Sequence, residues 1–347
     1  MLSLMTELRR VPLSVLDIVP VQKTSSPTDA LRVTSSLARR AEKLNFTRFW
    51  VAEHHNAENI ASSSPAVILS ALGAVTDRIR IGSGGVMLPN HPPLVVAEQF
   101  GTLAALYPGR VDLGIGRAPG TDPITAGALR RLPVEEFAGE FENLLGFLSG
   151  EFPEGHPYRT VAAVPTADTA PAVWMLGSSS NSARTAGRLG LPFAYANHFN
   201  ADGTLEAVAA YRESFRPSDR LSEPYLIVSL QVVCAETDEH ARYLADPAVL
   251  SVLKTRHTPF TEPYPSPEDA AAHVWTEEER AWADARQAAQ AVGGPDKVRA
   301  RLAEFIEKTQ LNELMITNSV TDESEKLQSL ERVRGMFGDE LPQGIAW

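Results

Sequence analysis

The chain has 347 residues, of which 44% are hydrophobic, and it carries a formal net charge of −11 at pH 7. An acidic chain repels nucleic acid and anionic membrane surfaces, so neither is expected as a partner. A single cysteine, Cys234, excludes an internal disulfide and favours a reducing compartment such as the cytoplasm. No apolar run reaches the roughly 18 residues that a membrane helix needs, and we expect no secretory signal.

Apolar segments alternate with helix-like segments in chain order. We predict strands at residues 13–21, 48–53, 79–88, 110–116, 172–177, 192–199, 226–235 and 313–318. Helical spacing or a long helical region follows each of them, with clear segments at 27–44, 64–75, 93–107, 133–149, 181–190, 202–215 and 322–337. The strands are apolar throughout, so both of their faces should be covered.

Eight strand–helix units predict an α/β fold, a (β/α)₈ TIM barrel, with residues 1–347 forming a single domain. An open doubly wound sheet gives the same local pattern, but the length and the number of units favour the barrel. Residues 150–171 and 245–293 interrupt the repeat, and long excursions of this kind are usually functional lids or disordered. The second follows strand seven, so we predict an insertion over the active-site face.

Two adjacent histidines follow the second strand, in the segment VAEHHNAENI. If the strand continued, His54 and His55 would point to opposite sides, so they are poor joint ligands and we predict no metal site. His54 is either a histidine of an ordinary surface loop or an acid–base residue at the end of a barrel strand.

Three glycines, Gly82, Gly84 and Gly85, interrupt the third strand, where glycine is costly. They indicate either a β-bulge at a barrel corner or a flat ligand pressed on bare backbone.

The segment DLGIGRAPG (112–120) nearly matches a dinucleotide fingerprint. Its last glycine comes one residue too late, and no convincing helix follows before about residue 133, so a nicotinamide dehydrogenase is disfavoured. Arg117 remains, and a guanidinium at a strand end either grips a phosphate or forms a surface salt bridge.

Four serines follow strand five and open the next helix, in the segment GSSSNSA. Hydroxyls and free N–H groups at a helix N-terminus form an anion site, although simple capping needs only one of them. One phosphate between the ends of strands four and five would explain both these serines and Arg117.

The chain resembles the bacterial-luciferase-like flavin-dependent monooxygenases over nearly its whole length. The similarity is carried by FWVAEHHN, by IRIGSGGVMLPNHPPLVVAEQFGTLAALYPGRVDLGIGRAPG and by WMLGSSSNSA with GLPFAYANHF. The resemblance implies a catalytic histidine at His54 and a cis peptide under the flavin at Gly84–Gly85. It also implies that FMN is bound by Arg117, Ser178, Ser179, Ser182 and Asn197, with the phosphate on Arg117, Ser179 and Ser182. Luciferase has a reactive thiol where this chain has Gly116, so light emission is not implied.

The resemblance further implies the chemistry. Reduced FMN, supplied by a separate flavin reductase, would react with O₂ to a C4a-peroxyflavin that oxygenates a small organic substrate, in a homodimer. Two alternatives stay open from the sequence: an oxidoreductase of the same fold that uses F420, and a non-catalytic flavin-binding protein.

Overall fold

The computed structural model describes residues 8, 11–118, 120–129, 133–165, 170–255 and 262–338. Within these residues, eight parallel strands close into a ring in the order β1–β2–β3–β4–β5–β6–β7–β9, because β6 pairs with β7 and β9 pairs with β1. The ring confirms the predicted (β/α)₈ barrel and rules out an open sheet. The strands are β1 (Leu13–Asp17), β2 (Arg48–Val51), β3 (Arg80–Met87), β4 (Val111–Gly116), β5 (Ala172–Gly177), β6 (Phe193–Tyr195), β7 (Leu226–Cys234) and β9 (Glu313–Thr317).

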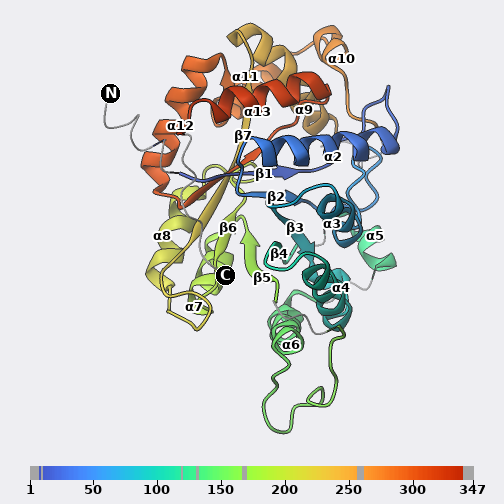
Figure 1. Cartoon of the computed structure of the whole chain (residues 1–347). Coiled ribbons are helices and arrows are strands. Elements are labelled where there is room, and N and C mark those ends of the chain that lie inside the picture. Colours follow the sequence, from blue (N-terminus) through green and yellow to red (C-terminus); the bar gives the residue numbers. More distant parts are fainter. Residues whose placement is uncertain are drawn as a thin grey trace.

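Helices surround the barrel and connect its strands (Figure 1). They are α2 (Pro27–Lys43), α3 (Pro65–Ala74), α4 (Pro93–Leu106), α5 (Pro123–Ala128), α6 (Phe137–Ser149), α7 (Ser180–Arg188), α8 (Thr204–Ser214), α9 (Asp238–Thr255), α10 (Pro267–Ala272), α11 (Glu277–Ala288), α12 (Pro295–Thr309) and α13 (Glu323–Arg334), with 3₁₀ turns η1 (Leu88–Asn90) and η2 (Val134–Glu136). None of the helices in the described ranges is both long enough and apolar enough to cross a bilayer.

Large side chains fill the inside of the barrel, which is a packed core rather than a pore. Trp50 and Trp174 meet edge to face, with ring centroids 5.3 Å apart, and Tyr225 packs on Trp174 at 5.8 Å. Alternate strand residues face the surrounding helices and form a second, larger apolar cluster with them. Both faces of the strands are therefore buried, which explains why the strand sequences are apolar without alternation.

Two short elements differ from the sequence-based prediction. Helix α5 begins at Pro123, where the sequence predicted a loop up to about residue 133, and Asp122 caps it through bonds from Ile124 N and Thr125 N. Strand β8 (Ala291–Gly293) pairs with the end of β7 outside the ring. Each has too few residues to show a hydrophobic period.

The predicted long helical region after β7 begins with α9 at Asp238, and residues 256–261 of the predicted 245–293 insertion lie outside the described residues. Its Tyr264 donates its backbone N–H to Val21 O (2.9 Å) in the segment that follows β1. This contact places the excursion at the carboxyl end of the strands. Figure 1 shows α9–α11 at the opposite end of the molecule from the loop after α6, so the excursion at 150–171 lies away from the predicted site.

Candidate functional site

The residues predicted to form the site are carried by the five neighbouring strands β2–β6 or by the loops that follow them, with Gly84 and Gly85 on β3. His54 follows β2, Arg117 is the first residue after β4, Ser178 and Ser179 join β5 to α7, and Asn197 follows β6. Because all the barrel strands are parallel, these loops lie at one end of the barrel, which is the end that carries active sites in this fold. The fold thus gathers residues that are up to 143 positions apart, from His54 to Asn197.

The glycine segment of β3 contains a β-bulge, which is one of the two alternatives that the sequence indicated. The Gly84–Gly85 peptide is cis, as predicted, and the pairing of β3 with β4 shifts register between Gly84 and Val86, as in a bulge. A Cβ on Gly84 would lie 2.6 Å from Leu16 Cδ1, and one on Gly85 would lie 2.8 Å from the Gly114 carbonyl oxygen. A side chain at Gly85 would meet the backbone of β4, so this position requires glycine, whereas one at Gly84 would require Leu16 to move.

Arg117 is exposed at the end of β4. Its guanidinium forms no ion pair or hydrogen bond with any residue in the described ranges, so the surface salt bridge considered from the sequence is not found there. A planar cation with its donors open can bind an anion in a bidentate manner.

The serine segment begins α7. Ser179 is the N-cap, with its hydroxyl accepting from Ser182 N, and Ser182 Oγ donates to Ser179 O (2.8 Å). The Ser178 carbonyl oxygen accepts from Asn200 Nδ2 (2.9 Å), which fixes the strand-to-helix turn. Strands β4 and β5 are neighbours, so the positive N-terminal end of α7 lies beside the strand end that carries Arg117.

Asn197 is buried, and its Oδ1 accepts a hydrogen bond from Thr204 Oγ1 (2.7 Å) at the start of α8. Its side-chain carbonyl thus joins the β6–α8 loop to the helix. The amide nitrogen is the group that is left for a ligand, and no protein partner for it is found among the described residues.

His54 is held by its backbone N–H, which donates to Ser62 O (2.9 Å). Its Nδ1 atom is buried and has no hydrogen-bond partner in the described part of the chain. Burial lowers the pKa of His54, with His55 acting in the same direction and Glu53 against it. The ring is therefore neutral near pH 7 and has a nitrogen available to exchange a proton.

Glu53 anchors the loop on which His54 lies, and the sequence analysis missed this role. Its buried carboxylate accepts from His55 Nε2 (2.9 Å), His91 Nε2 (2.8 Å) and Met87 N (3.1 Å). Burial opposes ionisation, but the bonds from His55 and His91 lower the pKa of Glu53 to about 2.

The two histidines point to different surroundings, as predicted for neighbours on an extended chain. His55 instead joins Glu53 and His91 in a group whose ligand atoms lie within 4.8 Å of one another and could hold a metal ion. The sequence offered no signal for this group, because His91 comes from the loop after β3. Hydrogen bonds satisfy the carboxylate in the structure as it stands.

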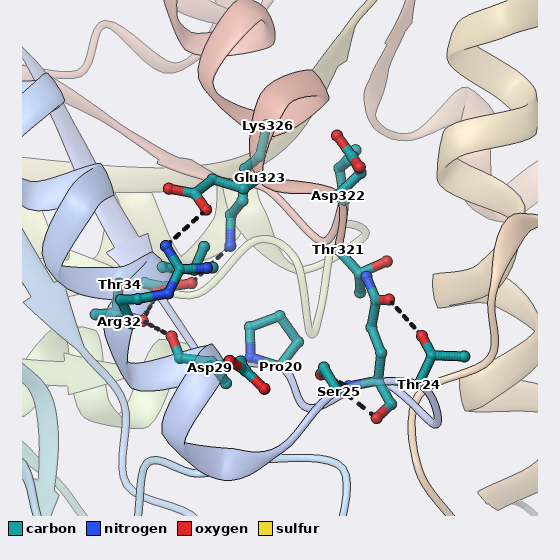
Figure 2. Close-up of a pocket in the computed structure, with 15 residues that line it drawn as sticks. Pro20, Thr24, Ser25, Asp29, Arg32, Thr34, Thr321, Asp322, Glu323 and Lys326 are labelled. Carbon is teal, nitrogen blue, oxygen red and sulfur yellow. Dashed lines mark hydrogen bonds and ion pairs between the residues drawn. The ribbon is translucent and has the colours of Figure 1, made fainter.

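A polar cavity of about 310 Å³ lies outside the barrel, between α2 and α13 (Figure 2). Its charged groups are largely paired: Lys326 Nζ lies 2.8 Å from Asp17 Oδ1, and Arg32 reaches Glu323 at 3.2 Å. The first pair joins α13 to the end of β1, and the second joins α2 to α13. None of the predicted site residues lines this cavity.

The sequence profile of luciferase-like monooxygenases matches residues 13–312. The chain belongs to the luciferase-like monooxygenase family. It is 44% identical to protein YvbT of Bacillus subtilis (strain 168) over 94% of this chain and 96% of that one. It is 39% identical to the luciferase-like monooxygenase of Escherichia coli (strain K12) over 93% and 96% of the two chains. A third relative, the N-acetyl-S-alkylcysteine monooxygenase of Bacillus subtilis (strain 168), is 39% identical over 67% of this chain and 70% of that one.

Solved structures agree with this family assignment. Apo-MsnO8 superposes on this luciferase-like monooxygenase with a TM-score of 0.86, at 34% identity over 94% of this chain and 98% of that one. The oxygenating constituent of 3,6-diketocamphane monooxygenase from Pseudomonas putida, in complex with FMN, has a TM-score of 0.69 at 19% identity, covering 96% and 98%. An F420-dependent secondary alcohol dehydrogenase has a TM-score of 0.66 at 15% identity, covering 94% and 98%. The last two likenesses concern the fold alone.

Proposed function

We propose that this protein is an FMN-dependent monooxygenase that uses reduced FMN and O₂ to oxygenate a small organic substrate. The observation that carries the proposal is the exposed guanidinium of Arg117 beside the N-terminus of α7, next to the glycine backbone of β3 at Gly84–Gly85. A flat ring with a phosphate-bearing tail fits this combination of groups.

Arg117 and the Asn197 amide nitrogen have no protein partner in the described residues, whereas the Ser182 hydroxyl donates to Ser179 O and would turn from it to bind a phosphate. Arg117, Ser179 and Ser182 would hold the phosphate, the Ser178 backbone and the Asn197 amide would meet the flavin, and Gly84–Gly85 would lie against the ring. When it is bound, reduced FMN supplies the electrons that activate O₂.

His54 would act as the acid–base residue. Its neutral imidazole can accept a proton at Nδ1, which has no protein partner in the described residues. We propose that residues 245–293 form a lid that excludes water from this end of the barrel, within a single domain of residues 1–347.

Thioethers are our first candidates for the substrate, because one relative of 39% identity is named an N-acetyl-S-alkylcysteine monooxygenase. We further propose a cytoplasmic homodimer that takes reduced FMN from a separate flavin reductase. An F420-dependent oxidoreductase is the second candidate, since an F420-dependent alcohol dehydrogenase shares the fold.

Oxygen consumption with chemically reduced FMN or reduced F420 tests the proposal, against a panel of thioethers, aldehydes, ketones and terpenes. We expect substrate-dependent oxygen uptake with FMN and oxygenated product by mass spectrometry. Binding of FMN without turnover on any member of the panel would favour a flavin-binding protein, and hydride transfer with F420 alone would favour the second candidate.

His54→Gln separates catalysis from binding. We expect it to keep FMN affinity and to lower turnover by roughly 10²- to 10⁴-fold, which is the usual contribution of general acid–base catalysis. His240→Gln, in the exposed pair with Glu325, is the matched control and should keep full turnover. Unchanged turnover in His54→Gln would remove His54 from the proposed chemistry.

A further inference from the structure

A second histidine lies at the same end of the barrel. His198 is in the loop after β6, and its Nδ1 lies 2.7 Å from Ser229 Oγ on β7. The Ser229 hydroxyl donates its only proton to the Tyr195 carbonyl oxygen at 3.2 Å. In this arrangement its oxygen accepts from the imidazole, with the proton of His198 on Nδ1 and Nε2 as the acceptor.

This acceptor is open to a ligand. His198 Nε2 has no hydrogen-bond partner in the described ranges, and it is not among the buried polar atoms that lack one, so it keeps accessible surface. The pKa of His198 is lowered to about 4, by burial first and then by the charges of His54 and Arg286. The ring is thus neutral at pH 7 and near His54.

Thr317 supplies an independent observation on the neighbouring strand. It lies opposite Gln231 in the pairing of β9 with β7, two residues beyond Ser229 on the same face of β7. It is 9% exposed, and its hydroxyl is buried without a partner in the described part of the chain. A buried hydroxyl without a partner is costly unless a ligand or water satisfies it.

The geometry points to a substrate subsite between β6, β7 and β9, in which His198 Nε2 accepts a hydrogen bond from a hydroxyl or N–H group of the substrate and Thr317 Oγ1 bonds the same polar end. Strands β3–β5 and Asn197, which directly precedes His198 in the loop after β6, carry the proposed FMN contacts, so the subsite borders the proposed flavin site at β6. The assignment of a substrate to this subsite rests on the proposed function, because it requires this end of the barrel to be the active site.

This subsite would favour polar substrates. A hydrocarbon in this place would leave both His198 Nε2 and Thr317 Oγ1 without partners, whereas a hydroxyl can donate to Nε2 and accept from the Thr317 hydroxyl. Sites built to bind a substrate donor discriminate strongly against analogues that lack it, because their own buried polar groups then stay unpaired.

The protein without flavin is sufficient for the first test. The ring ¹⁵N shifts of His198, assigned by comparison with His198→Gln, should show a neutral ring at pH 7 with the proton on Nδ1. A protonated ring, or a proton on Nε2, would overturn the inference.

The second test uses cyclohexanol and cyclohexanone, which are similar in shape, although only the alcohol donates a hydrogen bond. We expect cyclohexanol to shift the Nε2 signal of His198, and cyclohexanone to leave it in place. The affinity for cyclohexanol, measured from the NMR shifts of other residues, should fall roughly 3- to 10-fold in His198→Phe, which corresponds to one neutral hydrogen bond. In His198→Gln the affinity should recover.

Thr317→Val is a second variant that keeps the shape of the side chain. It should weaken alcohol binding by a similar factor without lowering the unfolding temperature, because the lost hydroxyl had no partner. His240→Phe is the control and should bind the alcohol as the parent does.

Equal effects of the two probes on the Nε2 signal, or no effect of either, would overturn the subsite. Neither test uses FMN or O₂, so either result stands even if the proposed monooxygenase activity fails.

Discussion

Arg117 provides the sharpest single-residue test of FMN binding. Its guanidinium makes no bond in the described part of the chain, so Arg117→Ala should leave the fold intact. We expect the variant to bind FMN about 2–3 kcal/mol more weakly, the size of a hydrogen bond to a charged group. That is roughly 30- to 150-fold in Kd, measured by fluorescence quenching.

Riboflavin has no phosphate, so its affinity should be nearly the same in Arg117→Ala as in the parent protein. Arg159→Ala, which removes an exposed arginine from the loop before β5, is the matched control and should bind both flavins as the parent does. If Arg117→Ala weakens FMN and riboflavin equally, Arg117 does not grip the phosphate.

His198 should give the stability of the protein a measurable dependence on pH. Its pKa is about 4 in the folded protein, through burial first, against about 6.5 in an unfolded chain. Between pH 4 and pH 6.5, about the two pKa values, the unfolded chain binds more protons at this histidine than the folded protein does. The free energy of unfolding therefore rises with pH in this window, and the part that is due to His198 stops changing above about pH 6.5. We expect His198→Gln to reduce the slope of the unfolding free energy against pH in this window, by at most about 1.4 kcal/mol per pH unit, as measured by urea unfolding.

The parent protein and His198→Gln share all other groups that titrate in acid, so the difference between their curves reports on His198. One shared group is Glu53: burial opposes its ionisation, but the bonds from His55 and His91 lower its pKa to about 2. His240→Gln should keep the slope of the parent. Parallel curves for the parent and His198→Gln would show that His198 titrates normally in the folded protein.

At the scale of elements, the capping of α7 can be separated from the phosphate binding that we propose for it. Ser179 caps the helix, and its loss to alanine should cost about 1 kcal/mol of stability. If α7 also binds the phosphate, Ser179→Ala should weaken FMN binding too. Ser26→Ala removes the equivalent cap from α2 and should lower stability by a similar amount with FMN affinity unchanged. Equal FMN affinity in the two variants would leave Ser179 with capping alone.

Elements with many buried residues were predictable from the sequence, and short ones were not. The barrel strands were found near their observed positions because each is a continuous apolar segment covered on both faces. Helix α5 and strand β8 escaped because their boundaries depend on Asp122 capping and on pairing with β7.

The same distinction holds for the candidate site. The positions of Arg117 at a strand end and of Ser179 at a helix start were predictable, because such positions can be inferred from local sequence. The bond between His198 and Ser229 joins residues 31 positions apart, and that from His91 to Glu53 joins residues 38 positions apart. No spacing rule connects such pairs before the fold is known.

At the scale of the molecule, one ionic network crosses the inside of the barrel at the end opposite the site. Arg48 on β2 bonds Glu313 on β9 (2.7 and 2.9 Å) and Asp112 on β4 (2.7 Å). Asp112 also bonds Arg80 on β3 (2.6 Å), and Tyr225 donates to Glu313 (2.8 Å). Burial opposes the charge on Arg48, but the two carboxylates hold its pKa above the usual value.

Arg48→Met should therefore destabilise the whole barrel. Asp112 keeps Arg80, but among the described residues Glu313 would keep only hydroxyl partners, Tyr225 and Ser14, around a fully buried charge. Breaking a buried pair from one side typically costs about 3–5 kcal/mol, which we expect in urea unfolding. Arg32→Met breaks the exposed pair with Glu323 and should cost at most about 1 kcal/mol. Similar losses in the two variants would mean that the network contributes no more to the barrel than a surface ion pair does.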